Sequence, residues 1–295
     1  MESFVEPHSS AWQPLTPRGV ASFARAGLGR VLLLELVVAL AVAGVVAWFI
    51  ATCWVPTISA AIERLPKEAA IRAGRLNWAG NSRQALAESR FLAFSVDLNH
   101  DGQARSLSHI QVEFGQTDVR IYSLFGCLAV FYPTRYSIAF NSQELKPWWG
   151  AWEPILLAIC VGATVVGLLV CWAILASVYC ILVWLLGLFF NRELSTAGSW
   201  RLASASLMPG ALLMTAAIGL YGLGGMDVVR LLAATGLHFV VGWVYLFLGV
   251  MAAPKLRSGL GGKTNPFAST PVSLAQPDQK SEDVKSSNPF RSRGD

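Results

Sequence analysis

The chain has little charge. Asp, Glu, Lys and Arg make up 14% of its 295 residues, whereas hydrophobic residues make up 54%. Soluble domains carry about 25% charged residues, so this composition excludes an ordinary water-soluble domain. The net charge of +5 is spread along the chain without a dense Lys/Arg block, and it gives no indication of nucleic-acid binding.

Catalytic and metal-binding patterns are also missing. The sequence contains no Walker loop, no G-x-G-x-x-G, no His-Glu-x-x-His and no Ser or Cys nucleophile signature. None of the four His has a second His or Cys at metal-ligand spacing. We therefore expect a protein that is not an enzyme and holds no cofactor. Cysteines are few, and the sequence leaves open whether Cys53 and Cys127 pair.

Long apolar runs are what the sequence does contain. About 20 apolar residues cross the ~30 Å hydrocarbon core of a bilayer, and the chain has four such runs: 31–54, 153–190, 202–226 and 228–253. The first is too long for a signal-peptide core, so we expect a retained anchor. The fold class predicted is an α-helical integral membrane protein with about four transmembrane helices and an inserted small α+β extracytoplasmic domain.

The run at 153–190 has two interpretations. As one helix it would be much longer than the hydrocarbon is thick, yet beyond Pro154 it has no Pro, Asn or Asp to make a turn. We expect one long, tilted helix, and two short spans remain the alternative.

Lys and Arg near the membrane ends predict the orientation. They flank the runs on the side of segments 1–30, 191–201 and 254–295, which we expect to be cytoplasmic together with both termini. Residues 55–152 then form the external module. Four tryptophans lie where rings anchor at the outer headgroups: Trp54, Trp148, Trp149 and Trp152.

The external module shows helical spacing over 58–74, with a break at Pro66, and then strand periodicity. The expected strands are 94–98, 110–114, 119–125, 128–132 and 136–140. We expect an antiparallel sheet in which the last two strands pair across Pro133. Apolar residues at 110, 112 and 114 predict which face of that strand is buried.

Asp97, Asn99, Asp101 and Gly102 match the start of a calcium loop. Position 12 of that loop should be Glu and is Ser108, and Arg105 brings a positive charge. Strands flank the segment, and Asp-Gly suits a hairpin turn. We expect a turn, with calcium binding as the alternative.

Two ionisable residues lie inside the apolar runs. Glu35 could serve packing, reach the interface, or carry an ion or proton. His238 is expected to bond a neighbouring helix, with a functional role as the alternative. Gly242 and Gly249 share a helix face, which suits helix packing within the chain or in a homo-oligomer.

The segment 254–295 is rich in Ser, Pro, Gly and charge, and predicts a disordered tail. It carries Asn-Pro-Phe at 265–267 and 288–290, either as turns or as peptide ligands.

The layout of one long external module, a long second helix, and Arg201-Leu202-Ala203 with Pro209 opening the third span resembles a family of uncharacterised four-span bacterial inner-membrane proteins. The resemblance implies a bacterial cytoplasmic membrane and no particular chemistry.

We expect a non-enzymatic protein of the lipid bilayer whose external module recognises a protein partner or an envelope component. The alternative is small-solute or proton-coupled transport that uses Glu35.

Overall fold

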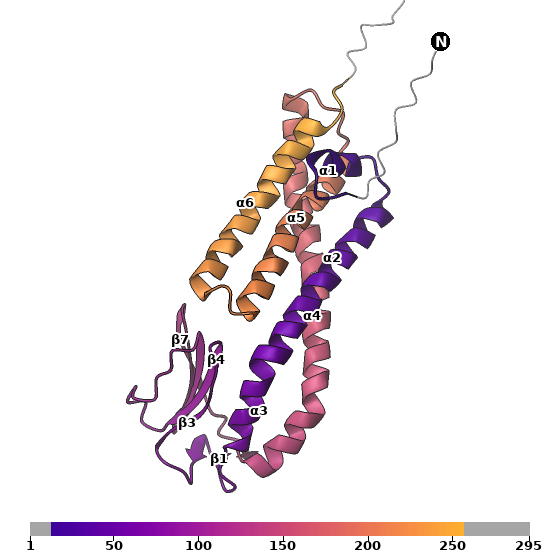
Figure 1. The fold of residues 1–295 in the computed structure, drawn as a ribbon. Helices are drawn as coiled ribbons and strands as arrows, with labels where there is room; N and C mark the ends of the chain where they lie inside the picture. The colour runs from indigo at the N-terminus through magenta and orange to yellow at the C-terminus, as the bar shows by residue number, and fades with distance from the viewer. Residues whose placement is uncertain (1–12, 257–295) are drawn as a thin grey trace, which may run out of the picture. The chain divides into compact units, whose positions relative to one another are not determined.

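The computed structural model describes residues 13–256 (Figure 1). Four helical segments are long and apolar enough to cross a membrane: 28–63, 142–189, 196–222 and 228–252. A small β-sheet region lies between the first and the second. The expected tail and its two Asn-Pro-Phe motifs lie outside the described residues, apart from 254–256.

The first segment is one continuous helical path in three parts. A short helix α1 (Pro17–Phe23) precedes α2 (Leu28–Phe49), which continues through a π-helical turn, η1 (Ile50–Trp54), into α3 (Val55–Glu63). Pro56 explains the wide turn, because its ring lacks an N–H and crowds the carbonyl four residues earlier. The helix expected over 58–74 is therefore right only as far as Glu63, since Ala70–Arg72 forms a strand.

The second segment is a single helix, α4 (Ser142–Phe189), of 48 residues. It is about 72 Å long at 1.5 Å per residue, and it begins well before the expected residue 153. Figure 1 shows it bend near its start, where Pro147 and Pro154 interrupt the hydrogen-bond ladder. The expectation of one helix rather than two agrees with the structure.

The bundle is completed by α5 (Thr196–Gly222) and α6 (Val228–Ala252). In the most apolar 18-residue stretch of α5, 50% of the residues are buried, against 6% in the corresponding stretch of α4. The central helix is therefore α5, whereas α4 exposes most of its apolar surface. Gly210 allows the close approach of α5 and α6, because a Cβ there would lie 2.6 Å from the His238 carbonyl oxygen.

The core of the bundle lies between these helices and includes Val31, Trp172, Leu202, Met208 and Val250. Gly249 packs against Val20 and Leu202, and Gly242 lies near Leu207. Both glycines therefore contribute to packing within the chain.

Residues 64–141, which we call the β module, form two sheets. The smaller has the order β2-β1-β8, from β1 (Ala70–Arg72), β2 (Arg75–Asn77) and β8 (Ile138–Ala139). The larger has the order β3-β4-β5-β6-β7. Its strands are β3 (Arg83–Glu88), β4 (Leu92–Asp97), β5 (Ile110–Phe114), β6 (Asp118–Ser123) and β7 (Gly126–Phe131).

Two expectations about this sheet are wrong. Strands β4 and β5 pair in parallel, with Ser95 opposite Glu113, so the segment between them is a crossover and not a hairpin turn. Strand β7 pairs with β6, while β8 pairs with β1, so these two strands are not partners across Pro133. The antiparallel sheet that we expected is thus a mixed one, and β3 was not anticipated.

Candidate functional site

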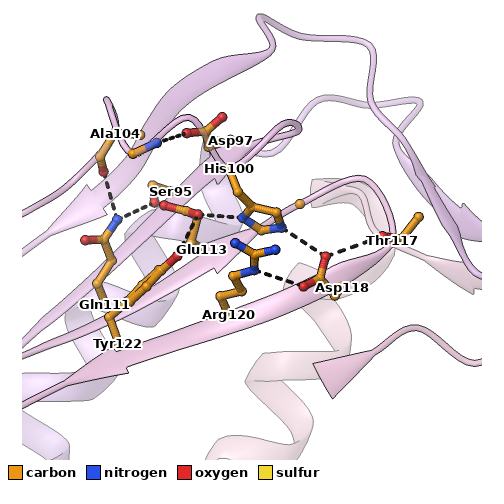
Figure 2. Close-up of polar contacts among 12 residues, drawn as sticks. Ser95, Asp97, His100, Ala104, Gln111, Glu113, Thr117, Asp118, Arg120 and Tyr122 are labelled. Carbon is orange, nitrogen blue, oxygen red and sulfur yellow. Dashed lines mark hydrogen bonds and ion pairs between the residues drawn. The ribbon is translucent and has the colours of Figure 1, made fainter. Parts of the chain in front are cut away.

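One face of the larger sheet carries buried polar side chains, which we call the polar layer: Ser95, Asp97, His100, Gln111, Glu113 and Asp118 (Figure 2). The connection 98–109 covers the polar layer. The Gln111 side chain donates to the Ala104 carbonyl at 2.8 Å and accepts from the Ser106 amide at 2.9 Å, which holds this connection over the sheet. The opposite face packs with Ala61 and Leu65 at the end of α3.

The burial of β5 is the reverse of the expected pattern. Gln111 and Glu113 are buried, whereas Ile110, Val112 and Phe114 are only half-buried. Of the alternating apolar residues, Phe114 packs with the cluster on the α3 side, whereas the polar residues are covered by the crossover.

His100 is the centre of the polar layer. Its Nδ1 lies 2.6 Å from Glu113 Oε1 and its Nε2 lies 2.9 Å from Asp118 Oδ1, with all three side chains nearly enclosed. Gly115 makes room for the imidazole, which occupies the place that a side chain at that position would take. The imidazole therefore bridges the two carboxyl groups, with one ring nitrogen directed at each.

The electrostatics of Asp118 combine opposing effects. Burial raises the pKa of this carboxyl, but the hydrogen bonds and charges of His100 and Arg120 outweigh burial and hold the pKa below its usual value. Arg120 Nε donates to Asp118 Oδ2 at 3.1 Å. The pairing also holds the pKa of Arg120 above its usual value.

The chemistry open to the polar layer is limited by its enclosure. His100 is nearly covered, so a substrate cannot reach the imidazole without movement of the crossover. Among residues 13–256, no group of three or more His, Cys, Asp or Glu side chains is placed to hold a metal ion. Glu113 Oε2 and Asp97 Oδ1 are buried without a hydrogen-bond partner. The layer links β4, β5, β6 and the crossover through charged groups.

The three side chains of the calcium hypothesis have different surroundings. Asp97 is buried and its Oδ2 accepts from the Gly102 amide at 3.1 Å, whereas Asn99 is exposed. Asp101 forms an ion pair with Arg83 on β3. His100 and Gly102 both have positive φ, so the segment is a tight bend within the crossover.

The β module is joined to the helical bundle by residues just before β4 and β5, which contact α5 and the α5–α6 connection. His109 Nδ1 lies 2.5 Å from the Tyr221 hydroxyl, and Arg90 donates to the carbonyls of Gly224 and Met226, each at 2.8 Å. Phe91 packs edge-on against Tyr221. Burial and then the positive charge of Arg90 lower the pKa of His109, and Asp227 offsets part of that effect.

The two intrahelical candidates do not lie together. Glu35 is 3% exposed, and its carboxylate accepts a hydrogen bond from the Ser204 hydroxyl of α5. It therefore packs inside the bundle and does not reach toward an interface. His238 does not make the expected bond to a neighbouring helix: its Nδ1 lies 2.5 Å from the Thr235 carbonyl oxygen of its own helix. The residue lines a mainly apolar cavity with Trp172 and Met214.

The four predicted anchor tryptophans fall into two pairs. Trp148 and Trp152 stack on each other at 6.2 Å and remain exposed on α4. Trp149 instead donates to the Ser59 hydroxyl of α3 at 3.0 Å, and Trp54 has a buried ring nitrogen without a partner. The exposed Trp148 and Trp152 therefore suit an anchoring role better than Trp54 and Trp149, which are partly buried.

The cysteines Cys53 and Cys127 are both free thiols. Cys53 is half-buried and lies 3.7 Å from the Gly222 carbonyl, whereas Cys127 is exposed on β7.

The sequence reasoning missed His100, Glu113, Asp118 and the His109–Tyr221 contact. A signal was present in Ser95, Asp97, Gln111 and Glu113, which recur at every second residue and so lie on one sheet face. No signal in the chain links His109 to Tyr221, which is 112 residues away.

Comparison with protein-family models, with curated proteins and with solved structures finds no match to this chain. The resemblance to four-span inner-membrane proteins therefore stays a prediction.

Proposed function

We propose that the protein is a non-enzymatic integral membrane protein whose β module, on the extracytoplasmic side of a bacterial cytoplasmic membrane, binds an extended segment of another protein. The observation that carries this proposal is the free edge of the larger sheet. All six residues of β7 are exposed, and the strand has a neighbour on one side only.

The edge formed by β7 lacks the usual protection. Natural edge strands are blocked by charge, proline or a covering element, but Gly126–Phe131 has no charge and no proline, and it exposes Leu128, Val130 and Phe131. At the opposite edge α3 packs against β3, and Arg64 just after α3 donates to the Leu86 carbonyl of β3 at 2.9 Å. An extended peptide that added to β7 would pair its backbone groups and cover the apolar side chains.

A second copy of the chain fits this edge less well. The β6–β7 turn shares a crevice with Val228 at the start of α6. Phe131 lies about 17 Å further along the strand, so β7 leads away from the proposed membrane. Copies in one membrane share an axis along its normal, which would set their β7 strands parallel. In a parallel pair, the residues whose backbone groups point toward the other strand are shifted by one position between the two strands. A two-fold axis along the strands places equivalent residues at the same height, so a closed dimer cannot have this shift.

The enclosed polar layer supports a binding role over catalysis, because it stiffens the sheet that carries β7 and leaves no reactive group open. The transport alternative has less support, since Glu35 is buried against Ser204 and does not line the cavity of His238.

The test places a photo-crosslinking amino acid at Val130 in the full-length protein, in its native membrane. The matched control position is Leu107, which is also apolar and is 99% exposed, but lies in the crossover. We expect one protein to crosslink at position 130 and not at 107, and its crosslinked peptide to be an extended segment.

A lysine at position 130 should abolish binding of that protein, whereas Leu107→Lys should leave binding intact. Equal crosslinking at both positions, or unchanged binding by Val130→Lys, would overturn the proposal. A crosslink between two copies of the chain would replace the heterologous partner with self-association.

A further inference from the structure

The turn that joins β6 to β7 has an unusual composition. Ser123 pairs with Gly126, so Leu124 and Phe125 are the two turn residues, and they are 54% and 83% exposed. Two-residue hairpin turns favour Gly, Asn and Asp for their backbone geometry. Turn chemistry therefore does not account for two large apolar side chains at this tip.

The tip lies at one end of the helical bundle. Leu124 lines the same crevice as Val228, the first residue of α6. The bonds from Arg90 to the α5–α6 connection hold the module in this position. Leu223 and Val229 are exposed in and beside the same connection. Exposed apolar side chains of the tip and of the α5–α6 connection therefore lie at the same end of the bundle.

The crevice behind the tip suits an anion. Its lining includes the guanidinium of Arg105, and none of the residues that line it is acidic. The Ser106 and Ser108 hydroxyls already donate to Glu88 Oε1 and to the Ser89 carbonyl, so Arg105 is the group that would meet the anion. The guanidinium lies 4.4 Å from the centre of the Tyr122 ring, which holds it in place beside the tip. Arginine in such a position pairs readily with phosphate oxygens.

We infer that the β6–β7 tip enters the leaflet on the module's side, and that the crevice takes the phosphate of a phospholipid in that leaflet. Leu124 and Phe125 would contact acyl chains, while Arg105 would contact the phosphate. At a bilayer surface, aliphatic and aromatic side chains lie at the edge of the hydrocarbon core, and basic groups lie further out among the headgroups. The tip and Arg105 would follow this order.

This inference rests on the proposed membrane orientation and does not depend on the partner at β7. A phospholipid is favoured over free phosphate because the apolar tip borders the crevice, whereas free phosphate would leave Leu124 and Phe125 without a role.

The experiment uses the full-length protein in nanodiscs that contain phosphatidylglycerol and diacylglycerol. A photo-crosslinking amino acid replaces Phe125, and in the control it replaces Phe131, which is 76% exposed at the other end of β7. We expect lipid adducts at position 125 by intact-protein mass spectrometry, enriched in phosphatidylglycerol, and none at position 131. Absence of lipid at 125, or equal adducts at 131, would overturn the inference.

Arg105→Gln separates the headgroup contact from the insertion of the tip. We expect this variant to keep lipid adducts at 125 but to lose the preference for phosphatidylglycerol. Arg75→Gln on β2 is the matched control and should keep the preference. If Arg105→Gln keeps the preference for phosphatidylglycerol, the phosphate contact of Arg105 is refuted. If inorganic phosphate abolishes that preference in the unsubstituted protein, the crevice binds the free anion and not the phospholipid. A protein crosslink at 131 with no lipid at 125 would leave the proposed function standing and this inference refuted.

Discussion

Asp118 is the buried carboxyl whose charge is maintained by its neighbours. Its pKa in the folded chain lies below the unfolded value of about 3.9. The unfolded state therefore binds the proton first as the pH falls. The stability that this carboxylate contributes is fully present above about pH 4, and is lost as the pH drops through the folded pKa.

We predict that Asp118→Asn lowers the melting temperature in detergent at pH 7 and makes its further decline below about pH 4 shallower. The reason is that the variant has no carboxylate to pair with Arg120 or to contact the His100 ring at any pH. Asp101→Asn is the control, because its partner Arg83 is well exposed and surface pairs contribute little. An acid profile of Asp118→Asn identical to that of the wild type would contradict the prediction.

A substitution of Glu35 distinguishes a packing role of this side chain from a role in transport. A glutamine has the same shape and keeps an oxygen that can accept from Ser204. We predict that Glu35→Gln changes the free energy of unfolding by less than about 1 kcal/mol and leaves insertion intact. Thermal unfolding and a flux assay in liposomes are the measurements, with Ser204→Ala as the control. A reconstituted flux that disappears in Glu35→Gln would favour transport.

At the scale of the elements, the contact between α5 and α6 depends on Gly210. A methyl group there would press on the His238 carbonyl, which belongs to helix backbone and cannot move aside cheaply. Gly236 in α6 has no atom within 4 Å of the corresponding position. Replacement by alanine can therefore be compared at a crowded position, Gly210, and at an open one, Gly236.

We predict that Gly210→Ala destabilises the protein by about 1–3 kcal/mol, as overpacking does. Gly236→Ala should be neutral or stabilising by up to about 1 kcal/mol, since alanine favours the helix. Melting temperatures of the two variants in the same detergent test this. Similar effects of both changes would show that helix propensity, and not the close approach, governs the response.

The connection between β4 and β5 shows why element pairing was mispredicted. The Asp-Gly at 101–102 does form a tight bend, but this bend lies inside a longer crossover that covers the polar layer. The positive φ of Gly102 is a local property that the Asp-Gly pair indicates, whereas the hairpin that we expected there does not form. Strand direction depends on which edges meet after the whole sheet assembles, and no local pattern specifies that.

For the whole molecule, orientation is the property on which both proposals rest. Cys127 is a natural reporter on the β module, and Thr196 at the start of α5 lies at the opposite end of the bundle. We predict that a membrane-impermeant maleimide added outside intact cells labels Cys127. It should not label Thr196→Cys in a Cys127→Ser background, unless the cells are opened. Labelling of position 196 from outside would invert or break the four-span arrangement.

The four long apolar helical segments could be located from the sequence, because the free energy of placing a segment in hydrocarbon depends on consecutive residues. It also indicated the single helix over 153–190, but it mispredicted which face of β5 is more completely buried. The tertiary structure alone decided the parallel β4–β5 pair, the contacts of His100 with two carboxyl groups, the contact of His109 with Tyr221 and the open edge at β7. Each of these depends on residues brought together from distant parts of the chain, and their interaction energies do not exist until the sheet and the bundle have formed.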